Sequence, residues 1–200
     1  AMYIADWQNG RILLVDLIPA GASYQCQYEV FLEGGPLNVC DMQFGPDGAL
    51  YFITGGRGSQ SGLYRVTPRS DQSPTSQAPK ISAQDREQGK TARQLRRNLE
   101  SYLNSPVPEI DVLWTHLSSD DRWLRFTARK ALEHQDVSRW RERALSETAP
   151  VAAIEALIAL CHQGTPEDRD AVLTALNRIE TSALSQEQLL ALLRAYELCC

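Results

Sequence analysis

A glycine-rich loop at residues 55–62 holds the residue types in this chain that could bind an anion or a polyol. Its sequence, GGRGSQSG, offers backbone amides together with the side chains of Arg57 and Ser59. Successive amides in such loops form concave anion sites. The loop lacks the Lys and the Ser or Thr that end a phosphate-binding loop, and it stands in no strand-to-helix pattern. We therefore predict Arg57 and Ser59 as ligand-binding residues, with a plain connection between strands as the alternative.

Two aspartates, Asp6 and Asp41, are the other predicted ligand-binding residues. Their carboxylates could act as axial ligands or as bases, and the alternative is that each accepts hydrogen bonds from the amides of a turn. The three histidines, His116, His134 and His162, all lie in the second half of the chain. This placement argues against a histidine general base in the first part, and the sequence assigns no catalytic residue.

The five cysteines show no spacing typical of a metal site. Cys161 precedes His162, as the last cysteine does in the haem-attachment motif Cys-x-x-Cys-His, but Ile158 stands where the first cysteine would be. We therefore expect no haem and no metal in this chain. Cys26 and Cys40 lie on successive predicted strands, where a disulfide in an oxidising compartment and a pair of buried free thiols are both open.

Charge and hydropathy exclude two classes of partner. No run approaches the roughly 18 consecutive apolar residues of a membrane span. The net charge of −5 argues against a nucleic-acid surface. Residues 71–100 carry six basic and four acidic side chains, which fits either a solvated helix face or a surface for an anionic partner.

Residues 41–66 have the pattern of an antiparallel meander. Runs of β-branched and aromatic residues at 49–54 and 63–66 are separated by glycine-rich segments. In the turn at 45–48, Pro46 restricts the first corner and the final glycine accepts a positive φ. Both faces of the strand at 49–54 are apolar, so we expect that strand to be covered on both sides.

The beginning of the chain repeats this pattern. Residues 3–6 correspond to residues 51–54, an offset of 48, and the hairpin over 3–17 turns at a Gln-Asn-Gly sequence that favours primed turns. Between the two copies, residues 24–32 and 38–44 are predicted as an outer fourth strand and as the first strand of the next unit. A period of about 40 to 50 residues is typical of propeller blades.

These segments resemble one blade of a β-propeller of the NHL and sugar-dehydrogenase kind. There, each sheet is a four-stranded meander whose aromatic-rich second strand follows a Pro-Asp-Gly turn. The resemblance is carried by Asp41, Phe44–Gly48, Leu50–Tyr51 and Gly62–Arg65. Because propellers need about four to eight blades to close, it implies that residues 1–68 are the terminal part of a larger ring.

The composition changes after residue 68. Residues 69–81 are rich in proline and polar side chains and are predicted to form an extended linker. A lead-in helix is predicted over 82–105, with Ser82 as a cap and Asp85 in the first turn. Residues 106–200 have the pattern of short helices in pairs, one of which begins at Pro150, where a missing amide donor costs little.

Residues 120–132 resemble the second helix of a HEAT repeat. In that family an Asp opens the helix, and an apolar-Arg pair is followed by Ala and then by Ala-Leu. Leu124-Arg125, Ala128 and Ala131-Leu132 match that order, and small alanines let neighbouring helices approach closely. The implied fold class is a β + α chain, with the C-terminal blade or blades of a β-propeller followed by an α-solenoid of HEAT-like helical pairs.

Together the two resemblances point to exported bacterial proteins of the membrane-bound dehydrogenase family. There, a sugar- or sorbosone-dehydrogenase-like propeller precedes HEAT-like repeats and often a c-type haem domain. The resemblance implies a sugar or polyol bound by the complete propeller, electron transfer to haem c or a quinone in the parent protein, and a periplasmic or cell-envelope location. The chain itself begins inside a strand pattern and ends inside a helix pattern, so we expect a non-catalytic junction fragment without a cofactor or a transmembrane segment.

The alternative function is a binding scaffold without enzymatic activity. The propeller would then hold a ligand, and the concave face of the helical repeats would bind a protein partner. Arg125 and Arg129 are the predicted partner-binding residues, and reversing their charges would abolish that binding.

Overall fold

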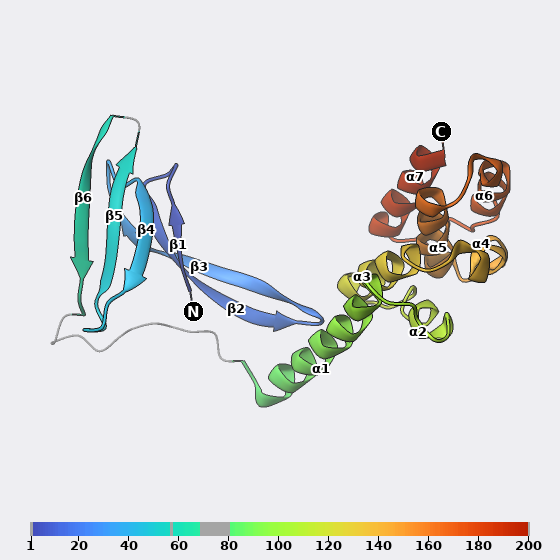
Figure 1. Ribbon diagram of the computed structural model, residues 1–200, viewed down its shortest axis with the longest axis horizontal. Helices are drawn as coiled ribbons and strands as arrows, with labels where there is room; N and C mark the ends of the chain where they lie inside the picture. Colours follow the sequence, from blue (N-terminus) through green and yellow to red (C-terminus); the bar gives the residue numbers. More distant parts are fainter. Residues whose placement is uncertain (1, 57, 69–80, 200) are drawn as a thin grey trace. The chain divides into compact units, whose positions relative to one another are not determined.

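The computed structural model describes residues 2–56, 58–68 and 81–199 (Figure 1). The chain divides into two compact units, residues 1–20 with 24–86 and residues 21–23 with 87–200. Apart from residues at the borders, the first unit carries the strands and the second carries the helices. The predicted linker over 69–81 lies outside the described residues except for Ile81.

The first sheet is built from three consecutive strands. These are β1 (Met2–Asp6), β2 (Arg11–Ala20) and β3 (Ser23–Glu33), in the order β1-β2-β3. β1 and β2 are antiparallel, with Asp6 opposite Arg11. The turn between them is the predicted one. Gly10 adopts a φ of +63° there, a backbone conformation that glycine reaches readily and that residues with a side chain rarely adopt.

The second sheet repeats the same plan. It consists of β4 (Val39–Phe44), β5 (Leu50–Gly56) and β6 (Ser59–Val66), all antiparallel, in the order β4-β5-β6 (Figure 1). The turn that precedes β5 is closed by the Gly48 amide, which donates to the carbonyl of Gly45 at 3.0 Å. Gly48 has a φ of +75°, so the predicted turn is confirmed.

A small apolar core joins the two sheets of the first unit. Its buried members are Ile12 of β2, Leu37, Val39 of β4 and Phe52 of β5. The expectation that β5 is covered on both sides is wrong, because Ile53 on its other face is exposed. Alternation along a strand sends successive side chains to opposite faces, and the described residues cover one of these faces only.

The second unit is helical. Its seven α-helices within the described residues are α1 (Ala83–Glu100), α2 (Asp111–Trp114), α3 (Arg122–Glu133), α4 (Arg141–Ser146), α5 (Pro150–Gln163), α6 (Arg169–Leu176) and α7 (Gln186–Cys199). Short 3-10 turns occur at 101–103, 137–139 and 166–168. The turns at 137–139 and 166–168 precede α4 and α6.

Helix α5 is the centre of the helical core. Eight of its residues, all Ala, Ile or Leu, are buried, and it packs against α3, α4, α6 and α7. A helix that is apolar on all sides must be surrounded in this way. It begins at Pro150 as predicted, and the neighbouring Trp140 ring is fully buried.

Two predicted helix starts are confirmed by their caps. The Asp85 amide donates to the Ser82 hydroxyl at 3.0 Å at the start of α1. At the start of α3, Asp121 accepts hydrogen bonds from the amides of Trp123 and Leu124. Such side chains satisfy donors that have no partner inside the helix.

The predicted fold class is wrong. The described residues form two three-stranded sheets rather than four-stranded blades of a closed propeller, and seven helices of unequal length rather than a long solenoid. The Pro-Asp-Gly turn and the alanine positions specify a local hairpin or helix contact. They do not specify how many strands a sheet has, or how many helix pairs stack, because those depend on contacts between distant segments.

Candidate functional site

The residues predicted to bind a ligand lie in the strands of the first unit. Asp6 ends β1 and accepts hydrogen bonds from Asn9 and from Arg11 Nε, the latter at 2.7 Å. The Asn9 bonds and then the Arg11 bond lower the pKa of Asp6. These contacts close the first hairpin, which is the turn role left open as an alternative to ligand binding.

Asp41 lies on the exposed face of the second sheet, away from the core. Its Oδ1 accepts from the Met42 amide at 2.8 Å, and its side chain borders a shallow depression of about 130 Å³ between β4, β5 and β6. Ser59 is the first residue of β6, and Arg57 lies outside the described residues. Asp6 and Asp41 therefore belong to two different sheets.

The predicted partner-binding arginines lie in a network of ion pairs between helices. The side chains of Arg125 and Arg129 are only 14% and 16% exposed. Arg129 Nε lies 2.9 Å from Glu155 Oε2 on α5. Arg125 Nη2 lies 3.2 Å from Glu187 on α7, and its Nη1 donates to the carbonyl of Ser119 at 2.6 Å. The two arginines thus connect α3 to α5 and α7.

Glu133 is the most deeply buried acid of this network. Its side chain is 1% exposed, and its Oε1 lies 3.0 Å from His162 Nδ1 and 3.7 Å from Arg129 Nη1. Its Oε2 pairs with Lys130 Nζ. Burial raises the pKa of the neighbouring Glu155, and the charges of Arg129 and Arg125 oppose that rise. Buried acids need such partners because an unpaired buried charge is very costly.

Helix α3, which carries the arginines of this network, also exposes two aromatic rings. Trp123 is 40% exposed and Phe126 is 48% exposed. The guanidinium of Arg122 lies 5.2 Å from the Trp123 ring centre, and that of Arg96 on α1 lies 5.9 Å from it. Arg129 lies 5.4 Å from the centre of Phe126. We call Arg96, Arg122, Trp123 and Phe126 the aromatic-cationic surface.

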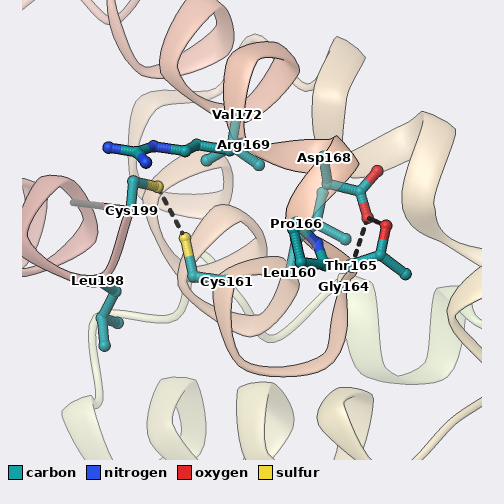
Figure 2. A pocket seen from close by; sticks show the side chains of 10 residues that line it. All are labelled: Leu160, Cys161, Gly164, Thr165, Pro166, Asp168, Arg169, Val172, Leu198 and Cys199. Carbon is teal, nitrogen blue, oxygen red and sulfur yellow. Dashed lines mark hydrogen bonds between the residues drawn. The ribbon is translucent and has the colours of Figure 1, made fainter.

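A cavity of about 260 Å³ lies between α5, α6 and the end of α7. Figure 2 shows its ten lining side chains, among which Cys161 of α5 and Cys199 of α7 point toward each other. Their sulfur atoms are 3.1 Å apart. Burial, and then the contact with Cys199, raises the pKa of Cys161 to about 12, so the Cys161 thiol keeps its proton at neutral pH.

The opposite wall of the cavity is anchored by Asp168. Asp168 Oδ2 accepts from the Thr165 amide at 2.8 Å, and Oδ1 accepts from Arg141 Nε at 2.5 Å. The Thr165 bond and then the Arg141 bond lower the pKa of Asp168 against the opposing effect of burial. The carboxylate therefore holds the loop before α6 in place.

Replacing Asp168 with alanine should lower the free energy of unfolding by about 2–3 kcal/mol at pH 7, since two charge-assisted hydrogen bonds are lost. The folded pKa of Asp168 is depressed, so its stabilisation is present above the unfolded value of 3.8 and is lost as the pH falls through the folded value. Urea unfolding at pH 7 and pH 3 would show the difference shrinking at pH 3. Asp170→Ala, at an exposed position in the first turn of α6, is the matched control, and an equal loss in both variants would contradict the assignment.

The cysteines of the first unit behave differently. Cys26 and Cys40 are both free and exposed, so neither a disulfide nor a pair of buried thiols describes them. The pair of Cys161 and Cys199 is not predicted from the sequence, because a separation of 38 positions matches no motif. One signal was available: α6 returns the chain between α5 and α7, so the ends of α5 and α7 that carry these cysteines can meet.

The described part of the chain contains neither a metal-binding cluster nor a membrane-spanning helix. No group of three or more His, Cys, Asp or Glu side chains there could hold a metal ion. Among the helices described, none is both long and apolar enough to cross a membrane.

Comparison of the chain with models of protein families found no match, and comparisons with curated proteins and with solved structures found none either. The resemblance to the dehydrogenase family, with the function, cofactors and location that it implies, therefore stays a prediction.

Proposed function

We propose that the helical unit is a binding module for an acidic protein segment, which docks on the aromatic-cationic surface of α1 and α3. The observation that carries this proposal is the exposure of Trp123 and Phe126 with an arginine over each ring. Aromatic and arginine side chains dominate the energetics of many protein interfaces. A partner with carboxylates beside an apolar side chain would pair with the guanidinium groups and cover the rings.

The charges on this surface favour an acidic partner. Arg122 is exposed and forms no ion pair with any of the described residues. Arg96 pairs with Glu100 at 2.9 Å on a partly exposed part of α1, and exposed pairs of this kind are weak enough to exchange partners. The surface thus offers cationic groups that a carboxylate can reach.

The predicted partner residues take a supporting role in this proposal. The guanidinium of Arg129 lies 5.4 Å from the centre of the Phe126 ring and stays paired with Glu155. Arg125 holds the start of α3 through the carbonyls of Ser119 and Asp120. In this proposal both arginines hold α3 and its aromatic rings in position and do not contact the partner. The predicted sugar or polyol oxidation depended on a propeller, and no observation on the described residues favours it.

Replacing Trp123 with alanine should weaken binding of an acidic peptide at least about tenfold, because a central aromatic side chain is lost. Binding is measured by fluorescence anisotropy as the protein is titrated into short fluorescein-labelled peptides. The first peptide consists of glutamates with interspersed leucines, the second of glutamates alone, and the third has lysines in place of the glutamates. We expect tightest binding of the first, no binding of the third, and weaker binding at high salt. Tyr28→Ala, which removes an exposed ring of the first unit, is the matched control. Absence of binding to the acidic peptides, or equal binding by the Trp123→Ala variant, would overturn the proposal.

A further inference from the structure

The pair formed by Cys161 and Cys199 is distinct from the proposed docking surface. The two thiols come from different helices, and their sulfur atoms lie 3.1 Å apart. A disulfide bond is about 2.05 Å long, so a movement of about 1 Å would bring the sulfurs within bonding distance. Thiols placed so closely by two rigid helices are in position for a two-electron reaction.

The surroundings of the pair give a small reagent access to it. Both cysteines are only partly buried, and they line the cavity of about 260 Å³. This volume lies just below the roughly 300–1,000 Å³ of sites for drug-sized molecules, so one half of a small disulfide can enter. In Figure 2 the Arg169 side chain extends toward the end of the cavity that holds Cys199. Its guanidinium can pair with a carboxylate.

We propose that Cys161 and Cys199 form a reversible dithiol-disulfide site that reacts with small-molecule disulfides bearing carboxylates, the class to which glutathione disulfide belongs. Arg169 binds the carboxylate of the reagent at the cavity, and Cys199 is the attacking residue. Cys161 is the resolving residue, which closes the internal disulfide.

The exchange balances in two steps. The Cys199 thiolate attacks one sulfur of the reagent, the reagent S–S bond breaks, and one half leaves as a thiolate that takes up a proton. Cys161 then loses its proton and attacks Cys199 Sγ, which forms the internal disulfide and releases the second half as a thiol. The two cysteines lose two electrons and two protons, and the reagent gains them as two small thiols.

The environment of the pair sets the order of attack. The Cys161 thiol is protonated at neutral pH, and the Arg169 side chain extends toward Cys199 (Figure 2), so a reagent bound at Arg169 meets Cys199 first. Asp168 and Arg169 are the ionisable side chains that line the same cavity beside the two cysteines. Asp168 is already paired with Arg141, which leaves Arg169 as the cationic group facing the reagent.

The test uses the full chain with Cys26, Cys40 and Cys200 replaced by serine, so that only the pair remains. The protein is equilibrated with mixtures of reduced and oxidised glutathione, and the remaining thiols are alkylated and located by peptide mass spectrometry. We expect a single transition in which both thiols disappear together and return on addition of dithiothreitol. Independent modification of the two cysteines, without an internal disulfide, would overturn the proposal.

Three variants separate the assigned roles. Cys161→Ser should stop the reaction at a glutathione adduct on Cys199, whereas Cys199→Ser should slow all modification at least tenfold. Arg169→Ala should slow the reaction with glutathione disulfide but leave the reaction with the uncharged disulfide of 2-mercaptoethanol unchanged. Arg194→Ala removes an exposed arginine of α7 that lies outside the cavity lining and serves as the matched control. Equal slowing of both reagents by Arg169→Ala would remove its role in binding the carboxylate.

Discussion

Replacing Glu133 with alanine should lower the free energy of unfolding of the helical unit by about 3–5 kcal/mol, the range found when one partner of a buried ion pair is removed. The Glu133 carboxylate is almost completely buried and lies among Arg129, Lys130 and His162. Without it, Arg129 keeps only Glu155 as its anionic partner among the described residues. Chemical denaturation followed by circular dichroism at 222 nm measures the loss.

A matched control separates burial from charge. Glu197 also pairs with an arginine, Arg194 on its own helix, but both side chains are exposed. Glu197→Ala should therefore change the free energy of unfolding by less than about 1 kcal/mol. If Glu133→Ala changed the free energy of unfolding as little as Glu197→Ala does, the ion pairs of Glu133 would not hold the helices together.

This network shows where reasoning from the sequence was limited. Arg125 and Arg129 lie one helical turn apart, a spacing that fits an exposed binding face as well as a buried pair. Their acidic partners, Glu155 and Glu187, are on other helices. Whether the two arginines form an exposed binding face or buried ion pairs depends on how α3 packs against α5 and α7. That packing cannot be derived from a single sequence.

Short-range signals were predicted well because the interacting groups are neighbours in the chain. The Gly48 turn, the Ser82 cap and the start of α5 at Pro150 are all predicted from a few adjacent residues. Each depends on a backbone angle or on an amide within three positions.

The fold class was wrong because it was extended from these local signals to a whole architecture. A meander with a Pro-Asp-Gly turn occurs in propeller blades, but nothing within residues 41–66 specifies a fourth strand or the closure of a ring. Similarly, Ala128 and Ala131 lie in the buried face of α3, as they would in a HEAT repeat. The helices after it differ too much in length for regular stacking.

The candidate thiol site required information of a third kind. Cys161 and Cys199 each lie near the C-terminal end of a helix, and only the alternation of α5, α6 and α7 brings those ends together. The haem-attachment motif that Cys161 partly matches consists of neighbouring residues only. The partner of Cys161 was instead supplied by tertiary structure.

Oxidation of the pair should raise the free energy of unfolding of the helical unit by about 4 kcal/mol. This is the value that the chain-entropy model gives for a cross-link between cysteines 38 positions apart in the sequence. The bond would restrict the unfolded chain, while the folded helices already hold the sulfurs close together. Urea unfolding of the variant that keeps only Cys161 and Cys199, compared with and without dithiothreitol, measures this difference.

The same comparison distinguishes a well-placed disulfide from a strained one. The Cys161→Ser variant should unfold identically with and without dithiothreitol, which controls for effects of the reductant on the rest of the chain. A gain close to the entropic value would mean that α5 and α7 need little adjustment to form the bond. If oxidation instead left stability unchanged or lowered it, closing the gap of about 1 Å would distort the packing of α7 on α5, and the reduced pair would be the form that the fold favours.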